Sequence, residues 1–153
     1  MQVRLNTVAI VDDDEISLLL IRKFLEQKQA AKIILPFSNG FEAISFLDEN
    51  ADNLLELPWL ILLDITMPGM SGWQFLKELN KIQFVEGYKP AVCIISASET
   101  IDFQILKNYP FIKGYLMKPV IPGKLITIVE QMRMSVEASS SISSQFAERE
   151  YNQ

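Results

Sequence analysis

Polar side chains follow several apolar runs of this chain, at the points where those runs end. Asp12 and Asp13 come directly after Thr7–Val11, and Asp64 comes directly after Trp59–Leu63. Such runs are typical of strands buried on both faces of a parallel sheet. In open α/β sheets, ligand sites lie just beyond the carboxyl ends of the strands. Ordinary turn chemistry is the alternative, because Asp also favours turns and helix caps. The elements that carry these carboxylates decide between the two interpretations.

Five apolar runs alternate with segments of helical periodicity along the chain. This alternation predicts a doubly wound α/β fold, in which a five-stranded parallel sheet of order 2-1-3-4-5 forms the middle of a flavodoxin-like three-layer α/β/α domain. The expected strands are Thr7–Val11, Lys32–Leu35, Trp59–Asp64, Ala91–Ser96 and Phe111–Met117. A helix is expected after each strand. Pro36 is expected to end the second strand, and Ser98 to cap a fourth helix near Glu99–Asn108.

In that strand order, the first and third strands are neighbours and the topology reverses between them. Asp12, Asp13 and Asp64 would then converge in one crevice, although about 50 residues separate them in the chain. Three close carboxylates repel one another, and a bound divalent cation is one way to keep them ionised at neutral pH. Oxygen-only ligation with retained waters suits magnesium.

Two further strand ends would flank this crevice. Ser96 ends the fourth apolar run and offers a hydroxyl, and Lys118 follows the fifth and offers an ammonium group. This set of groups matches phosphoryl transfer to a carboxylate, in which cations and a hydroxyl stabilise the phosphoryl oxygens. Asp64 is the natural nucleophile, because it stands alone at the end of the middle strand. Asp12 and Asp13 would lie on the side where the cation binds.

Composition narrows the function classes further. The 153 residues suit one domain, and the net charge of -5 with a pI near 4.8 argues against a nucleic-acid partner. The absence of histidine excludes Ser-His-Asp triads and most zinc sites. Cys93 lies within the apolar run AVCII and is expected in the core. No targeting segment and no run of about 20 apolar residues is visible, so we expect a cytoplasmic protein without membrane insertion.

The motifs IVDDD, LLDITMPGMSG, IISAS and YLMKPV resemble, in order and separation, those of the receiver domain of two-component response regulators of the chemotaxis-regulator type. The resemblance covers roughly Asn6 to Val136. It implies that Asp64 is the phosphoacceptor, that Asp13 binds Mg²⁺ directly and that Asp12 binds it mainly through water. The backbone carbonyl of Thr66 would be a further metal ligand.

The same resemblance assigns roles to four other residues. Ser96 and Lys118 would stabilise the phosphoryl group, and the bond between Lys118 and Pro119 would be cis. Ser96 and Tyr115 would form the switch, in which the hydroxyl moves toward the phosphoryl oxygens and the aromatic ring rotates inward. The implied output surface is the face made by the fourth helix, the fifth strand and the fifth helix.

These observations predict a receiver domain over residues 6–136 and a Ser-rich, loosely ordered tail over residues 137–153. We expect a stand-alone response regulator, not an enzyme, that accepts a phosphoryl group from a sensor histidine kinase or phosphotransfer protein and signals to a further, unknown protein. A phosphorelay intermediate is the first alternative. An Asp-nucleophile magnesium-dependent hydrolase would want a second Asp where Thr66 stands, and a flavodoxin-like nucleotide binder would not place Asp12–Asp14 in its phosphate loop. A receiver used only as a constitutive docking module is a further alternative.

Overall fold

The structure, a computed structural model, describes residues 5–97 and 101–151, and the side chains among them up to residue 138. Its helices and strands alternate along the chain, and the connection between α3 and β4 contains one 3₁₀ turn. In chain order they are β1 (Thr7–Val11), α1 (Glu15–Gln27), β2 (Ile33–Phe37), α2 (Gly40–Glu49), β3 (Leu60–Asp64), α3 (Gly72–Lys81), the 3₁₀ turn η1 (Val85–Gly87), β4 (Ala91–Ser96), α4 (Phe103–Leu106), β5 (Ile112–Met117) and α5 (Pro122–Tyr151).

The five strands form one sheet in the order β2-β1-β3-β4-β5, and every neighbouring pair is parallel. This arrangement confirms the predicted doubly wound fold and its strand order. The three central strands β1, β3 and β4 are completely buried along their length, as their uninterrupted apolar sequences predict. The edge strands β2 and β5 are partly exposed.

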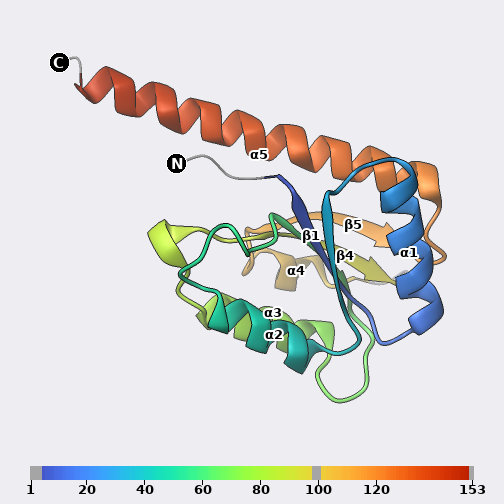
Figure 1. The fold of residues 1–153 in the computed structure, drawn as a ribbon. Coiled ribbons are helices and arrows are strands. Elements are labelled where there is room, and N and C mark those ends of the chain that lie inside the picture. The colour runs from blue at the N-terminus through green and yellow to red at the C-terminus, as the bar shows by residue number, and fades with distance from the viewer. Residues whose placement is uncertain (1–4, 98–100, 152–153) are drawn as a thin grey trace.

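Helices cover both faces of the sheet and divide the core into two layers (Figure 1). On one face, α1 and α5 pack against alternate strand residues through Ile21, Leu25, Leu125, Val129 and Met132. On the other face, α2 and α3 contribute Ala43, Leu47, Phe75, Leu76 and Leu79. Because successive strand residues point to opposite faces, both layers share the same strands and hold the carboxyl ends of the strands in fixed register.

Side-chain caps begin the helices that follow the strand ends. Asp14 accepts hydrogen bonds from the amides of Ile16 and Ser17 at the start of α1. At the start of α3, Ser71 and Gln74 form a complete capping box, as the spacing predicts. Asn39 accepts a bond from the amide of Glu42 at the start of α2. These caps fix where each helix begins, and α1 and α3 begin directly beyond the loops that carry Asp12, Asp13 and Thr66.

Two details of the sequence prediction are wrong. Pro36 does not end β2 but lies inside it, opposite Ile10. An edge strand tolerates proline because one side of the strand has no neighbour that needs its amide. The fourth helix is a single turn, Phe103–Leu106, capped by the Asp102 side chain and shorter than the expected Glu99–Asn108. Ser98, the cap predicted for it, lies outside the described residues.

The last helix, α5, extends beyond the sheet (Figure 1). Its backbone is helical through Tyr151, and its first residue is Pro122, which suits the first turn of a helix. The division into a domain over residues 6–136 and a tail over residues 137–153 stays a prediction. Among the described residues, no helix has both the length and the apolar character needed to cross a membrane.

Candidate functional site

The candidate site lies at the carboxyl edge of the sheet, where four neighbouring strands end. Asp12 follows β1, Asp64 and Ser96 are the last residues of β3 and β4, and Lys118 follows β5. The pairing of Val11 with Leu63 places Asp12 beside Asp64 across the point where the topology reverses. The fold therefore brings together residues that stand far apart in the sequence.

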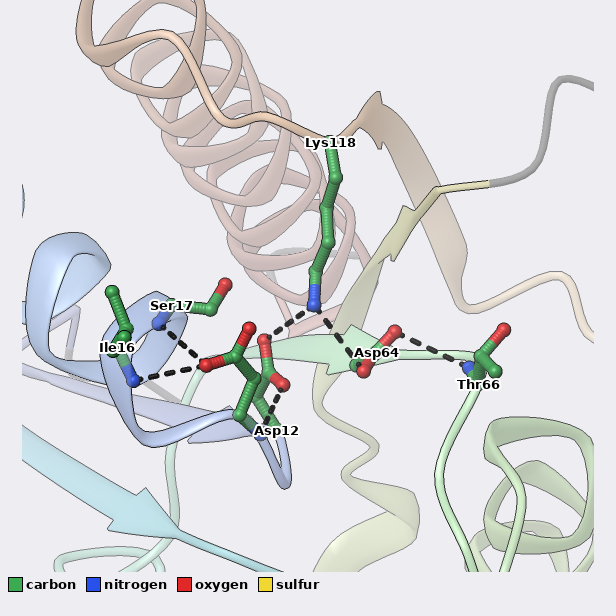
Figure 2. Close-up of polar contacts among 7 residues, drawn as sticks. Asp12, Ile16, Ser17, Asp64, Thr66 and Lys118 are labelled. Carbon is green, nitrogen blue, oxygen red and sulfur yellow. Dashed lines mark hydrogen bonds and ion pairs between the residues drawn. The ribbon is translucent and has the colours of Figure 1, made fainter.

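Three carboxylates form an acidic cluster at this edge. One oxygen atom each of Asp12, Asp13 and Asp64 lies within 4.8 Å of the others, in an arrangement that could hold a metal ion. Asp12 and Asp64 are 2% and 4% exposed, whereas Asp13 is open to solvent. Asp12 Oδ1 accepts a hydrogen bond from the amide of Asp14, and Asp64 Oδ1 accepts one from the amide of Thr66 (Figure 2). One oxygen of each buried carboxylate is thus held by backbone, and the other faces the site.

The Lys118 ammonium lies between the two buried carboxylates (Figure 2). Its Nζ atom is 3.0 Å from Asp12 Oδ2 and 3.3 Å from Asp64 Oδ2. The Lys118 amide also donates to the carbonyl of Ser96 at 2.8 Å, which ties the residue to the end of β4. The peptide bond between Lys118 and Pro119 is cis. The lysine side chain therefore reaches back across β4 toward β3.

Burial and neighbouring charge shift the pKa of two of these groups. Burial, followed by the negative charge of Asp12, raises the pKa of Asp64 to about 6, although Lys118 and the Thr66 amide act in the opposite direction. Burial lowers the pKa of Lys118, but hydrogen bonding and attraction to Asp12 and then Asp64 outweigh it, so the pKa of this ammonium lies above its usual value. Lys118 is therefore charged at neutral pH.

The residues of the acidic cluster fit a hard divalent cation. One ammonium opposes three carboxylates, so the site retains excess negative charge while Asp12, Asp13 and Asp64 are ionised. Asp12 Oδ2 is buried and lies 3.0 Å from the Lys118 ammonium, and a carboxylate oxygen has more than one lone pair, so it could also bind a cation. The donor set consists of oxygen atoms alone, which is the set that hard cations prefer.

Two other predicted site residues lie on the neighbouring strands β4 and β5. Ser96 is 2% exposed at the end of β4, one strand away from Asp64. Tyr115 is half-buried in β5 and packs against the core layer beneath α2 and α3. Both residues have interactions within the protein. The structure thus places Ser96 beside the acidic cluster and Tyr115 two positions before the end of β5, with its ring on the face of the sheet opposite α5.

One residue near the site was missed in the sequence. The backbone of Gly72 packs directly against the end of β3, and a Cβ atom at this position would lie 2.7 Å from the carbonyl oxygen of Asp64. The amide of Gly72 donates to the carbonyl of Ile65 at 2.9 Å. A glycine soon after a strand-end Asp is a signal for such close backbone approach, but turn chemistry explains the same pattern.

An apolar pocket of about 410 Å³ opens beside Lys118, between α1 and the connection from β5 to α5. Its walls are Asp14, Ile16, Ser17, Leu20, Ile21, Phe24, Lys118, Pro119 and Val120. Ile16 is 71% exposed and Leu20 is 45% exposed at its rim. An apolar surface therefore adjoins the charged site and remains open to solvent.

Comparison with known proteins points to the receiver domains of response regulators. The family profile of the response regulator receiver domain matches residues 8–130. An uncharacterised 14.6 kDa protein of Leptolyngbya boryana is 32% identical over 124 residues, which are 81% of this chain and 87% of that protein. The probable C4-dicarboxylate response regulator DctR of Priestia megaterium is 27% identical over 83% of this chain. A solved two-component response regulator of Cytophaga hutchinsonii is 25% identical, covers 84% of this chain and 96% of its own, and superimposes with a TM-score of 0.71.

The match to DctR covers only 51% of that protein's length, so this chain spans about half of a relative whose name gives a role. The match to the Leptolyngbya protein covers most of both chains, but that protein is uncharacterised.

Proposed function

The chain belongs to the response regulator receiver domain family, and we propose that Asp64 is its phosphoacceptor. The observation that carries this proposal is the position of one atom. Asp64 Oδ2 is buried at the end of the central strand, beside the acidic cluster and 3.3 Å from the Lys118 ammonium. An attacking carboxylate needs positive charge at the place where phosphoryl oxygens will lie, and this geometry supplies it.

The reaction is the transfer of a phosphoryl group from a phosphohistidine to Asp64. A carboxylate oxygen of Asp64 attacks the phosphorus in line, the P–O bond forms, and the P–N bond to the histidine breaks with its electron pair on nitrogen. Lys118 neutralises one phosphoryl oxygen, and the Ser96 hydroxyl donates a hydrogen bond to another. Magnesium, held by Asp12, Asp13, Asp64 and the backbone carbonyl of Thr66, would offset the remaining negative charge.

We assign the phosphodonor to a sensor histidine kinase or a phosphotransfer protein that docks over the pocket beside Lys118. The donor histidine must reach Asp64, so its protein must cover the neighbouring surface. That surface is the apolar rim formed by Ile16 and Leu20, which are 71% and 45% exposed. Contiguous exposed apolar residues of this kind mark protein-binding sites.

The signal that the domain passes on begins with the negative charge that phosphorylation adds at the end of β3. Phosphorylation draws the Ser96 hydroxyl toward the phosphoryl oxygens, and Tyr115 then rotates inward along β5. The surface that reports this change is the face formed by α4, β5 and α5. It carries Phe103, which is 69% exposed, and Met117, which is 46% exposed. An unidentified protein would bind there, in the cytoplasm. The domain itself turns over no substrate beyond its own phosphoryl group.

Incubation with Mg²⁺ and acetyl phosphate, followed by intact-mass measurement, tests the proposal. We expect one phosphoryl adduct on the wild-type protein, no adduct without Mg²⁺, and no adduct on Asp64→Asn. Transfer of the adduct onward to a histidine of a phosphotransfer protein would make the domain a relay intermediate. Absence of an adduct at every Mg²⁺ concentration, in protein shown to be folded, would contradict the proposal. Continuous release of phosphate from varied phosphoesters without an adduct would indicate a hydrolase instead.

A further inference from the structure

The loop between β3 and α3, residues 65–71, carries Thr66 and is fixed at its base. The amide of Gly72 donates to the carbonyl of Ile65, which closes the loop directly after Asp64. A Cβ atom at Gly72 would lie 2.6 Å from the Cα of Ile65, so the two ends of the loop are in backbone contact. The base alone leaves the far side of the loop to be positioned by other contacts.

The far side of the loop rests on the start of α2. A Cβ atom built at Gly40 would lie 2.8 Å from Met70 Sδ, 3.1 Å from its Cγ and 3.3 Å from its Cβ. A Cβ atom at Gly69 would similarly lie 3.5 Å from the ring of Phe41. The first two residues of α2 therefore form a seat for the part of the loop opposite its base. In Figure 1 this loop lies at the edge of the molecule beside the starts of α2 and α3.

Backbone conformation does not explain the glycine at position 40. Glycine is less favourable than alanine in a helix, and Gly40 is the first residue of α2. Its φ is not in the left-handed region, unlike those of Gly69 and Gly87. What the position requires is space, because Gly40 is buried and the side chain of Met70 occupies the volume that a methyl group would take.

We propose that Gly40 and Met70 are positioning residues, which set the loop so that the Thr66 backbone reaches the phosphoacceptor site. Met70 lies four positions after Thr66 in the same loop. The Thr66 amide already holds Asp64 Oδ1 at 3.2 Å, so displacement of the loop moves a group bound to the nucleophile. A shift of about 1 Å in a positioning element is enough to lower the rate of a reaction substantially. This inference rests on the proposed function of Asp64.

Three variants test the contact as a thermodynamic cycle: Gly40→Ala, Met70→Ala and the double variant. Gly123→Ala is the matched control, because Gly123 also lies in the first turn of a helix but a Cβ atom there meets nothing within 4 Å. Helix propensity alone would make both glycine substitutions neutral or stabilising. Three quantities are measured: Mg²⁺ affinity by calorimetry, the rate of phosphorylation by acetyl phosphate, and the NMR shift of the Thr66 amide.

We expect Gly40→Ala to weaken Mg²⁺ binding and slow phosphorylation by about tenfold each, and to shift the Thr66 amide resonance. In the Met70→Ala background, the same substitution should change each rate or affinity less than about twofold, because the methyl group then enters vacated space. Gly123→Ala should leave all three quantities unchanged. If Gly40→Ala does not fold, the double variant is expected to fold, since it lacks the clash.

The inference is overturned if Gly40→Ala leaves the Thr66 amide resonance, the Mg²⁺ affinity and the phosphorylation rate at wild-type values. It is also overturned if the effect of Gly40→Ala is the same with and without the Met70 side chain. A double variant that also fails to fold overturns it as well. Failure of the proposed function looks different. In that case the wild-type protein forms no phosphoryl adduct, and the shift of the Thr66 amide across the cycle still decides whether Gly40 and Met70 position the loop.

Discussion

The Nζ atom of Lys118 lies 3.3 Å from Oδ2 of Asp64, a residue 54 positions earlier in the chain. Parallel pairing of β3 with β4 and of β4 with β5 produces this contact, because it places the ends of three strands at one edge. Two buried carboxylates share this single ammonium, since Asp12 Oδ2 is 3.0 Å from the same atom. Stability and chemistry at the site therefore depend on the same lysine.

Replacement of Lys118 by Met should lower both stability and reactivity. The buried charges of Asp12 and Asp64 lose their counter-ion, so we expect a loss of about 2–3 kcal/mol in the free energy of unfolding at pH 7, less than for a fully buried pair because Lys118 is 20% exposed. Phosphorylation by acetyl phosphate should slow by about a hundredfold, because a cation aimed at the phosphoryl oxygens is lost. Lys77→Met, at an exposed position on α3, is the control. Equal rates for the two variants would contradict this role of Lys118.

Magnesium should stabilise the folded protein through the acidic cluster. A cation that binds only the folded state adds about 1.4 kcal/mol when its free concentration is ten times Kd. We expect thermal unfolding to shift upward with MgCl₂ and not with NaCl at matched ionic strength. Asp13→Asn should remove the shift without unfolding the protein, because Asp13 is exposed. A full shift in this variant would mean that the cation binds elsewhere.

Tyr88 should make the fold sensitive to alkali. Its hydroxyl donates to the carbonyl of Pro58 at 2.7 Å, and burial raises its pKa well above the ordinary value of 10.0. The unfolded chain releases this proton at a lower pH than the folded chain, so stability is full below about pH 10 and falls as pH rises above it. We expect Tyr88→Phe to cost about 1 kcal/mol at pH 7 and to flatten the decline between about pH 10 and 11. Urea unfolding at several pH values measures both effects. If the free energy of unfolding of Tyr88→Phe declined as steeply above about pH 10 as that of the wild-type protein, Tyr88 would not be the source of the alkali sensitivity.

Cys93 should be chemically inert in the folded protein. The residue is 0% exposed in β4, so a reagent cannot reach its sulfur atom. Burial also raises the pKa of its thiol to about 12, so the reactive thiolate does not form near neutral pH. At pH 8 an aromatic disulfide reagent should label no thiol in the native protein and one thiol per chain in urea. Labelling of the native protein at the rate seen in urea would show that β4 opens readily.

Much of the fold could be predicted because the three central strands are almost entirely apolar. Thr7–Val11 and Ala91–Ser96 have the predicted bounds, and five β-α units leave few topologies. The fourth helix could not be placed, since Ser98 and Asp102 are equally good caps and the apolar pattern between them is weak. Strand ends pointed to Asp12 and Asp64, whose convergence the parallel topology requires.

Contacts that depend on backbone atoms, or on the space left by a missing side chain, could not be predicted from residue types. Arg133 of α5 donates to the carbonyls of Leu5 and Ala30, and its guanidinium lies over the ring of Trp59. Every residue has a backbone carbonyl, so no pattern of residue types predicts which carbonyls Arg133 contacts. The sequence does not distinguish Gly40 from other helix-start residues, although the absence of a side chain there leaves the space that Met70 occupies. Such features require the three-dimensional arrangement.

The most direct test of the central claim is to locate the phosphoryl group by mass spectrometry. The protein is treated with Mg²⁺ and acetyl phosphate, then reduced with borohydride, which converts an aspartyl phosphate to homoserine. Peptide sequencing should find homoserine at position 64 alone, and none in Asp64→Asn. Homoserine at Asp12 or Asp13, or a phosphoryl group on serine or threonine with Asp64 unmodified, would contradict the assignment of Asp64 as the phosphoacceptor.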